Sequence, residues 1–183
     1  MMIRTKQPWR ILRPQIDEQT EGTMEIDPIE LRNALGRFAT GVCVVTTASE
    51  GRAPIGMTVN SFSSLSLDPP LVLWSIQRDS DCRAAFDAAS TYCINVLASD
   101  QKELSGRFAR KNQHEVNEAD RFFEGELGLP VLMGCLVAFE CTIDARLDGG
   151  DHIILVGRVK AVHQGDGDKP LLFFAGGYQE LAS

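Results

Sequence analysis

Apolar residues recur at helical spacing in three short stretches of the chain. The first predicted helix starts at Asp27 and Pro28, since Asp caps a helix and Pro suits its first turn, and it stops at Gly41. A second helix is expected over 79–88, and a third follows the capping residue Ser99. Most of the regular structure must therefore come from strands.

Seven runs rich in β-branched and aromatic residues predict these strands. They cover residues 42–47, 53–59, 71–76, 92–97, 134–147, 152–163 and 171–174. Turn residues at Ser49-Glu50-Gly51 and at Asp148-Gly149-Gly150-Asp151 join two pairs of runs into hairpins. The predicted fold class is mainly β with short helices, an antiparallel barrel or sandwich, and the charged segment 110–120 is expected to be a mobile loop.

Size and charge limit what the protein does. The 183 residues fit one domain, expected over 24–183 after a flexible N-terminal extension over 1–23, although two small domains are also compatible with this length. A net charge of −7 disfavours nucleic acid as a partner, and no apolar run is long enough to span a membrane. Neither G-x-G-x-x-G nor a Walker A motif occurs, so a Rossmann or P-loop domain is not indicated.

Cysteine and histidine content narrows the chemistry further. The five cysteines form no C-x-x-C pair, and their odd number favours buried, reduced thiols. No apolar stretch with a cleavage pattern occurs near the N-terminus, so we expect a cytoplasmic protein. The histidines His114, His152 and His163 lack the spacing of metal ligands, and we expect no metal site.

Residues 56–66 form the most informative polar segment, with one Thr, one Asn and four Ser interleaved with apolar residues. Neutral donors and acceptors at this density suit the edge of a flat heteroaromatic ring and a phosphate monoester. The alternative is an ordinary half-exposed strand that leads into a loop. This segment is the first candidate for a ligand site.

Two further places are candidates. Arg78 and Ser80 stand where a strand ends and a predicted helix begins, which suits a phosphate, although a capped surface helix with a solvated Arg fits equally well. His152 follows a glycine-rich turn at the head of a strand, where an imidazole faces either a cleft or solvent.

Several motifs occur along the chain in an order that resembles the flavin reductase domain family. They include Ala39-Thr40-Gly41-Val42, the segment from Gly56-Met57-Thr58 to Pro69-Pro70-Leu71, Ile94-Asn95-Val96-Leu97, Gly150-Asp151-His152 and Gly157-Arg158-Val159. The resemblance covers about 29–178, which is nearly the whole chain apart from the N-terminal extension. Ser80-Asp81-Cys82 departs from the family's frequent Ser-x-Thr, and an acid at position 81 disfavours a nearby phosphate.

This resemblance implies a split-barrel flavin-binding fold, usually a homodimer, with FMN or FAD near the dimer interface and NADH or NADPH as the electron donor. The cofactor-binding residues that it implies are Gly56, Met57, Thr58, Val59, Asn60, Ser61, Ser63, Ser75, Gln77, Arg78, Ser80, Cys93, Asn95, Val96 and Tyr178. It implies His152 as the catalytic residue on the nicotinamide side, where the imidazole orients the nicotinamide amide and is not a proton donor.

We therefore expect NAD(P)H-dependent reduction of FMN or FAD, with the reduced flavin passed to a partner flavin-dependent monooxygenase. Hydride transfer requires two stacked flat rings, so the protein contributes mainly positioning and exclusion of water. Two alternatives stay open at this point. One is a non-catalytic dimer that binds flavin or a tetrapyrrole, and the other is a reductase that passes electrons through bound flavin to an acceptor such as a corrin.

Overall fold

The computed structural model describes residues 26–48 and 53–181, so the extension over 1–23 and the turn at 49–51 lie outside the described residues. Helix α1 (Pro28–Leu35) begins as expected, because the Asp27 carboxylate accepts hydrogen bonds from the backbone N–H groups of Ile29 and Glu30. The predicted end was wrong. The helix stops at Gly36, and Gly41 belongs to β1 (Thr40–Gly41).

Seven antiparallel strands form the main sheet, in the order β3-β2-β6-β9-β10-β5-β4. Their bounds are β2 (Cys43–Thr47), β3 (Ile55–Val59), β4 (Ser63–Leu67), β5 (Pro70–Gln77), β6 (Thr91–Val96), β9 (Val137–Gly149) and β10 (His152–Gln164). The antiparallel pairing of β2 with β3 and of β9 with β10 confirms the two predicted hairpins. β2, β3, β5 and β6 are each close to the length that an apolar run predicted, whereas β4 was not predicted as a strand.

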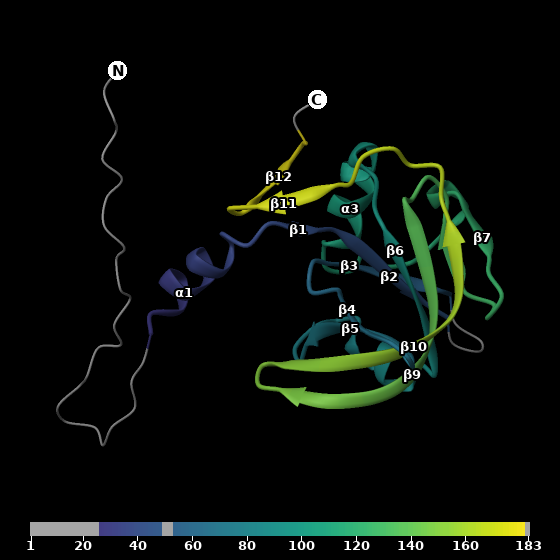
Figure 1. Ribbon diagram of the computed structural model, residues 1–183, viewed down its shortest axis with the longest axis horizontal. Helices are drawn as coiled ribbons and strands as arrows, with labels where there is room; N and C mark the ends of the chain where they lie inside the picture. The colour runs from purple at the N-terminus through teal and green to yellow at the C-terminus, as the bar shows by residue number, and fades with distance from the viewer. Residues whose placement is uncertain (1–25, 49–52, 182–183) are drawn as a thin grey trace.

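The long β9–β10 hairpin bends the sheet into a split barrel (Figure 1). Its open end pairs with β6 through β9, whereas its tip pairs with β5 through β10. The register shifts beside Gly157, where a side chain would overlap the hydroxyl of Tyr92, so glycine permits the close approach at the bend. The edge strands β3 and β4 do not pair with each other. Instead, Ser61, in the link between them, donates to the Ser75 carbonyl oxygen and accepts from the Ser75 N–H, both at 3.0 Å.

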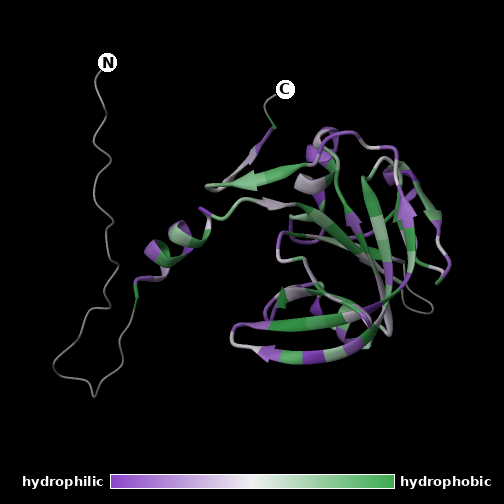
Figure 2. Ribbon diagram, viewed as in Figure 1, coloured by the Kyte–Doolittle hydropathy of each residue, from purple (hydrophilic) through white to green (hydrophobic). Residues whose placement is uncertain are grey.

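Apolar side chains fill the barrel, as the hydropathy of its strands indicates (Figure 2). Trp74 is fully buried and meets the rings of Phe86 and Tyr92 edge to face, at centroid distances of 4.9 and 5.7 Å. Ile94 and Leu155 complete the same core. A packed interior of this kind leaves the ligand site to the rim of the barrel.

Shorter elements surround the rim: α2 (Arg83–Ala88), η1 (Ser99–Gln101), α3 (Lys102–Phe108), η2 (Glu118–Asp120), β7 (Phe122–Glu124), β8 (Pro130–Leu132), β11 (Leu172–Phe174) and β12 (Gly177–Gln179). The second helix starts later than predicted. The Ser80 hydroxyl accepts from the Cys82 N–H in a turn, and α2 begins only at Arg83 without a side-chain cap. Within the described residues, no helix is long and apolar enough to cross a membrane.

Segment 110–120, predicted to be a mobile loop, is fastened to the edge of β3. Glu115 bridges to Ile55, and the Gly56 N–H donates to the His114 carbonyl oxygen at 2.7 Å. The charged composition misled the prediction because backbone hydrogen bonds to β3 and the buried side chain of Val116 hold this segment in place.

Helix α1 stands apart from the barrel (Figure 1), and none of its residues is buried. Ile29, Leu35 and the following Phe38 are 70%, 67% and 78% exposed. An amphipathic helix normally buries its apolar face, so this face has no cover within the described part of the chain.

Candidate functional site

A cavity of about 380 Å³ lies at the rim, where the ends of β3, β5 and α3 meet the head of β10. Its volume falls in the range of small-molecule sites, roughly 300–1,000 Å³. The lining residues are Met57, Thr58, Val59, Asn60, Ser61, Ser75, Gln77, Asp79, Ser80, Asp81, Phe108, Ala109, Lys111, His114 and His152. One site therefore brings together three parts of the chain that are distant in sequence: the polar segment after Gly56, the end of β5, and His152.

Several polar groups in this cavity have no hydrogen-bond partner among the described residues: the amides of Asn60 and Gln77, the Ser75 hydroxyl and Nε2 of His152. The other ring nitrogen of His152, Nδ1, lies 2.7 Å from Oδ1 of Asp151, and this contact lowers the pKa of Asp151. Because the carboxylate accepts, Nδ1 carries the proton, and Nε2 is left to meet a ligand.

Other predicted contacts line the cavity with their hydroxyls already hydrogen-bonded. The Thr58 hydroxyl donates to the Ser105 carbonyl oxygen at 2.7 Å, which ties β3 to α3. Ser61 is bonded twice to the Ser75 backbone, and the Ser80 hydroxyl accepts from the Cys82 N–H at 3.2 Å. These side chains shape the cavity and offer a ligand little unused hydrogen-bonding capacity.

His114 was missed by sequence reasoning, as were Asp79, Asp81, Phe108, Ala109 and Lys111. Its Nδ1 lies 3.1 Å from the Gly56 carbonyl oxygen, and its Nε2 lies 3.1 Å from Oδ1 of Asp81. Both partners are obligate acceptors, so the ring donates to both only when it is doubly protonated. In the sequence, His114 lies in a charged stretch that has no recognisable motif. Its partners come from distant segments, so no local pattern indicated that it belongs to the site.

Asp81 and Cys82 lie beside His114, and these three residues form a cluster that we call the clasp. The Asn112 N–H donates to the Asp81 carboxylate at 3.0 Å, and this bond is the main cause of the lowered pKa of Asp81. The side-chain atoms of Asp81, Cys82 and His114 that could bind a metal ion lie within 4.8 Å of one another. Burial raises the pKa of the Cys82 thiol to about 12, which keeps it protonated, and the direct contact between Asp81 and His114 makes the group a hydrogen-bonded clasp.

The remaining predicted residues do not line this cavity: Gly56, Ser63, Arg78, Cys93, Asn95, Val96 and Tyr178. Asn95 lies inside the barrel wall, fully buried, and its amide donates to the Val44 carbonyl oxygen and to the Thr46 hydroxyl. Its oxygen accepts from the Leu132 N–H at 2.9 Å. Every hydrogen-bonding direction is satisfied by protein, so Asn95 stabilises the wall and does not reach the cavity.

The other residues outside the cavity have local structural roles. A side chain at Gly56 would lie 2.8 Å from the ring of Phe108, so glycine lets that ring close the cavity. Cys93 is fully buried, and burial raises the pKa of its thiol. The Tyr178 hydroxyl lies 2.8 Å from the Ser105 hydroxyl, which fastens β12 to α3. The side chain of Arg78 hydrogen-bonds to the turn between β9 and β10.

A second cavity, of about 1,000 Å³, lies between α1, the end of β11 with the turn that follows it, and the tip of the β9–β10 hairpin. Leu35, Phe38 and Phe173 give it an apolar side. Asn60, Gln77 and His152 line both cavities. The two spaces therefore meet at three of the four side chains that carry unpartnered polar groups.

A family profile described as "Flavin reductase like domain" matches residues 35–182. The chain belongs to this family. It is 51% identical over 148 residues to the FMN reductase (NADH) SmoA of Agrobacterium fabrum, covering 80% of this chain and 82% of SmoA. Identity to the reductase subunit HsaB of a flavin-dependent monooxygenase from Rhodococcus jostii is 39%, covering 84% of this chain and 77% of HsaB.

Solved structures of the family share the fold. Flavin reductase PheA2 superposes with a TM-score of 0.79 at 39% identity, covering 86% of this chain and all of PheA2. The NADH:FAD oxidoreductase SgcE6 of Streptomyces globisporus, solved with NAD and FAD fragments, gives 0.78 at 34% identity, covering 85% of this chain and 93% of SgcE6. The split-barrel fold predicted for this family is thereby confirmed.

Proposed function

We propose that this protein is an NADH-dependent flavin reductase in which the smaller cavity binds the flavin and the larger one admits the nicotinamide. The observation that carries the proposal is the junction of the two cavities at Asn60, Gln77 and His152. Hydride transfer requires two rings in stacked contact, and two cavities that adjoin at shared lining residues would place the two ligands side by side. The names of SmoA as an FMN reductase (NADH) and of SgcE6 as an NADH:FAD oxidoreductase support the choice of ligands.

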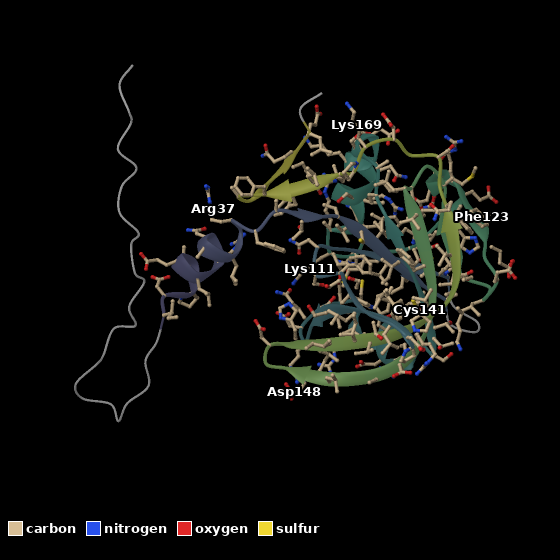
Figure 3. All side chains as sticks on the ribbon, viewed as in Figure 1. Arg37, Lys111, Phe123, Cys141, Asp148 and Lys169 are labelled. Carbon is tan, nitrogen blue, oxygen red and sulfur yellow. The ribbon has the colours of Figure 1, made fainter. Side chains whose placement is uncertain are left out.

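The smaller cavity fits a flavin by the chemistry of its lining. The amides of Asn60 and Gln77 supply unpartnered donors and acceptors for the edge of a polar heteroaromatic ring. Lys111, labelled in Figure 3, also lines the cavity and has no ion pair among the described residues, which suits the phosphate of FMN or FAD. Asp81 is already bonded to His114 there, so its charge is partly offset.

In the proposed mechanism, bound flavin supplies the hydride-accepting chemistry and the protein supplies geometry. Asp151 holds the His152 ring through Nδ1, and Nε2 accepts a hydrogen bond from the carboxamide of the nicotinamide. Phe108 and Met57 keep water from one wall of the flavin cavity. The bound flavin would accept hydride directly from the nicotinamide, so no residue of the chain is needed as a proton donor to carbon.

The partner we propose is a flavin-dependent monooxygenase that consumes the reduced flavin. Two named relatives support this assignment: HsaB is the reductase subunit of a flavin-dependent monooxygenase, and a relative in Acinetobacter baylyi is the reductase component of trigonelline monooxygenase. A cytoplasmic location is part of the proposal, because all five cysteines are free and buried, as expected in a reducing compartment.

A homodimer is also part of this proposal. The exposed apolar face formed by Ile29, Leu35 and Phe38 suits a second copy of the chain. Light scattering of the purified protein measures the molecular mass directly. We expect a dimer for the wild type and a shift toward monomer for Leu35→Asp, and a monomeric wild type would contradict this part.

One experiment tests the catalytic proposal. FMN or FAD is titrated into the purified protein while NADH and NADPH oxidation is followed by absorbance. We expect oxidation that depends on added flavin and is faster with NADH. Flavin binding without any nicotinamide oxidation would instead support a non-catalytic carrier.

A further inference from the structure

The side chain of Arg78 reaches the tight turn between β9 and β10 and not the flavin cavity. Its Nε donates to the Gly150 carbonyl oxygen at 2.7 Å, and its Nη2 lies 2.8 Å from the Asp148 carboxylate. The backbone N–H of Arg78 donates to the Asp151 carbonyl oxygen at 2.9 Å. One residue at the end of β5 thus contacts three residues of the turn, and Asp148 marks the tip of this hairpin in Figure 3.

The turn needs such an anchor because its own sequence is permissive. Gly149 and Gly150 lack side chains, and Gly150 has a φ of +77°, a conformation that glycine adopts without strain but does not enforce. The Gly150 N–H donates to the Asp148 carboxylate, which lowers the pKa of Asp148 and keeps it ionised beside Arg78. Asp148 is 79% exposed, so the ion pair alone contributes little, and the bonds to the turn backbone matter more.

The position of this turn determines where His152 lies. His152 directly follows the turn, pairing with Gly149 across the hairpin and with Gln77 across to β5. Asp151, whose carbonyl oxygen is held by the Arg78 backbone, is also the residue whose carboxylate fixes the His152 ring. A shift of the turn would therefore move the imidazole at the junction of the two cavities.

We propose that Arg78 is a positioning residue that locks the β9–β10 turn so that His152 faces the junction of the flavin and nicotinamide cavities. This role replaces the predicted contact of Arg78 with the flavin phosphate. It rests on the proposed function, because His152 acts on the nicotinamide only if the protein is a reductase.

Steady-state kinetics of Arg78→Gln with NADH test the role, and Arg158→Gln is the matched control. Arg158 also bonds to an aspartate within the β9–β10 hairpin, Asp144, but far from the turn. Arg78→Gln is expected to lower kcat/KM for NADH by about 10- to 100-fold, the scale of a small misplacement of a reacting group. Arg158→Gln should stay within about twofold of wild type, the scale of an exposed ion pair.

The choice of flavin separates positioning from phosphate binding. Riboflavin lacks the phosphate of FMN, so we compare the two as acceptors. A positioning role predicts the same fractional loss with both flavins and an unchanged Kd for FMN, measured by fluorescence quenching. Weaker FMN binding with unaltered riboflavin kinetics would overturn the inference in favour of a phosphate contact.

Arg78→Lys is a second variant in case Arg78→Gln does not fold. Lysine retains the charge but lacks the planar guanidinium group that reaches both the Asp148 carboxylate and the Gly150 carbonyl oxygen. Its kcat/KM should fall between wild type and Arg78→Gln, while backbone hydrogen exchange at Gly150 speeds up in both. If the wild type is active but Arg78→Gln has the same kinetics as Arg158→Gln, the role proposed for Arg78 is wrong and the proposed function stands. A wild type that oxidises no NADH with added flavin would overturn the proposed function and this role with it.

Discussion

Two asparagines of the barrel, Asn95 and Asn60, show how similar sequence contexts lead to opposite roles. Asn95 is fully buried, and both ends of its amide bond to the surrounding strands. Asn60 lies 35 residues earlier at the rim, lines both cavities, and its side chain has no hydrogen-bond partner among the described residues. A polar residue satisfied by protein stabilises the fold, whereas one left unsatisfied at a cavity is available to a ligand.

The largest effect should come from removing the satisfied member of the pair. Asn95→Ala leaves the Leu132 N–H and the Val44 carbonyl oxygen without this partner in the barrel wall, so we expect a loss of about 3–5 kcal/mol in the free energy of unfolding. Urea denaturation measures it. Activity per folded molecule should change little, and a stable variant that loses flavin binding would place Asn95 in the site after all.

His152→Ala should give the next largest effect, because it removes the ring nitrogen that faces the junction of the cavities. We expect kcat/KM for NADH to fall about 10- to 100-fold while the Kd for flavin stays within about twofold. Lys160→Ala, an exposed change on the same strand, is the control. Equal losses in flavin affinity and NADH turnover would mean that His152 belongs to the flavin cavity alone.

Gln77→Ala and Asn60→Ala should have smaller effects on ligand binding and turnover. Each removes an unpartnered amide from the wall that both cavities share, so flavin Kd and NADH KM should both rise, by about 2- to 10-fold for a hydrogen bond or two. Thr58→Val is the matched contrast, because its hydroxyl already donates to Ser105. We expect it to lower the melting temperature and leave flavin Kd nearly unchanged, and the reverse pattern would contradict the distinction.

The smallest effect concerns acid stability at the clasp. The pKa of Asp81 lies below its ordinary 3.8, so its bonds to Asn112 and His114 stabilise the folded state above that pH and are lost as pH falls through the folded pKa. Asp81→Asn should lower the melting temperature at pH 7, by the equivalent of less than about 1 kcal/mol for so exposed a group. The difference from wild type should shrink toward pH 3, and a constant difference would mean that the charge is irrelevant.

Sequence reasoning succeeded where the cause of a feature is local. The start of α1 at Asp27 and the two hairpins follow from capping and turn residues within a few positions. It failed where contacts with residues far along the chain determine the role of a side chain. The partners of Asn95 lie 51 and 37 residues away, and His114 bonds to Gly56 across 58 residues.

The same limit explains why the sequence indicated a phosphate contact for Arg78. Beside Ser80, at the end of a strand, its positive charge is typical of a phosphate contact. The turn that binds its side chain lies 72 residues further along the chain. The resemblance named these residues together, and the side-chain geometry separates those that line the cavity from those that support its wall.

The uncovered face of α1 has a practical consequence for anyone who assays this enzyme. Because that helix and Phe38 border the cavity assigned to the nicotinamide, dissociation of the proposed homodimer should lower the rate per milligram of enzyme. If the proposed homodimer forms, a sample diluted far below the dissociation constant of the dimer should lose activity over minutes and regain it when reconcentrated. Enzyme concentration therefore belongs among the reported conditions of every rate.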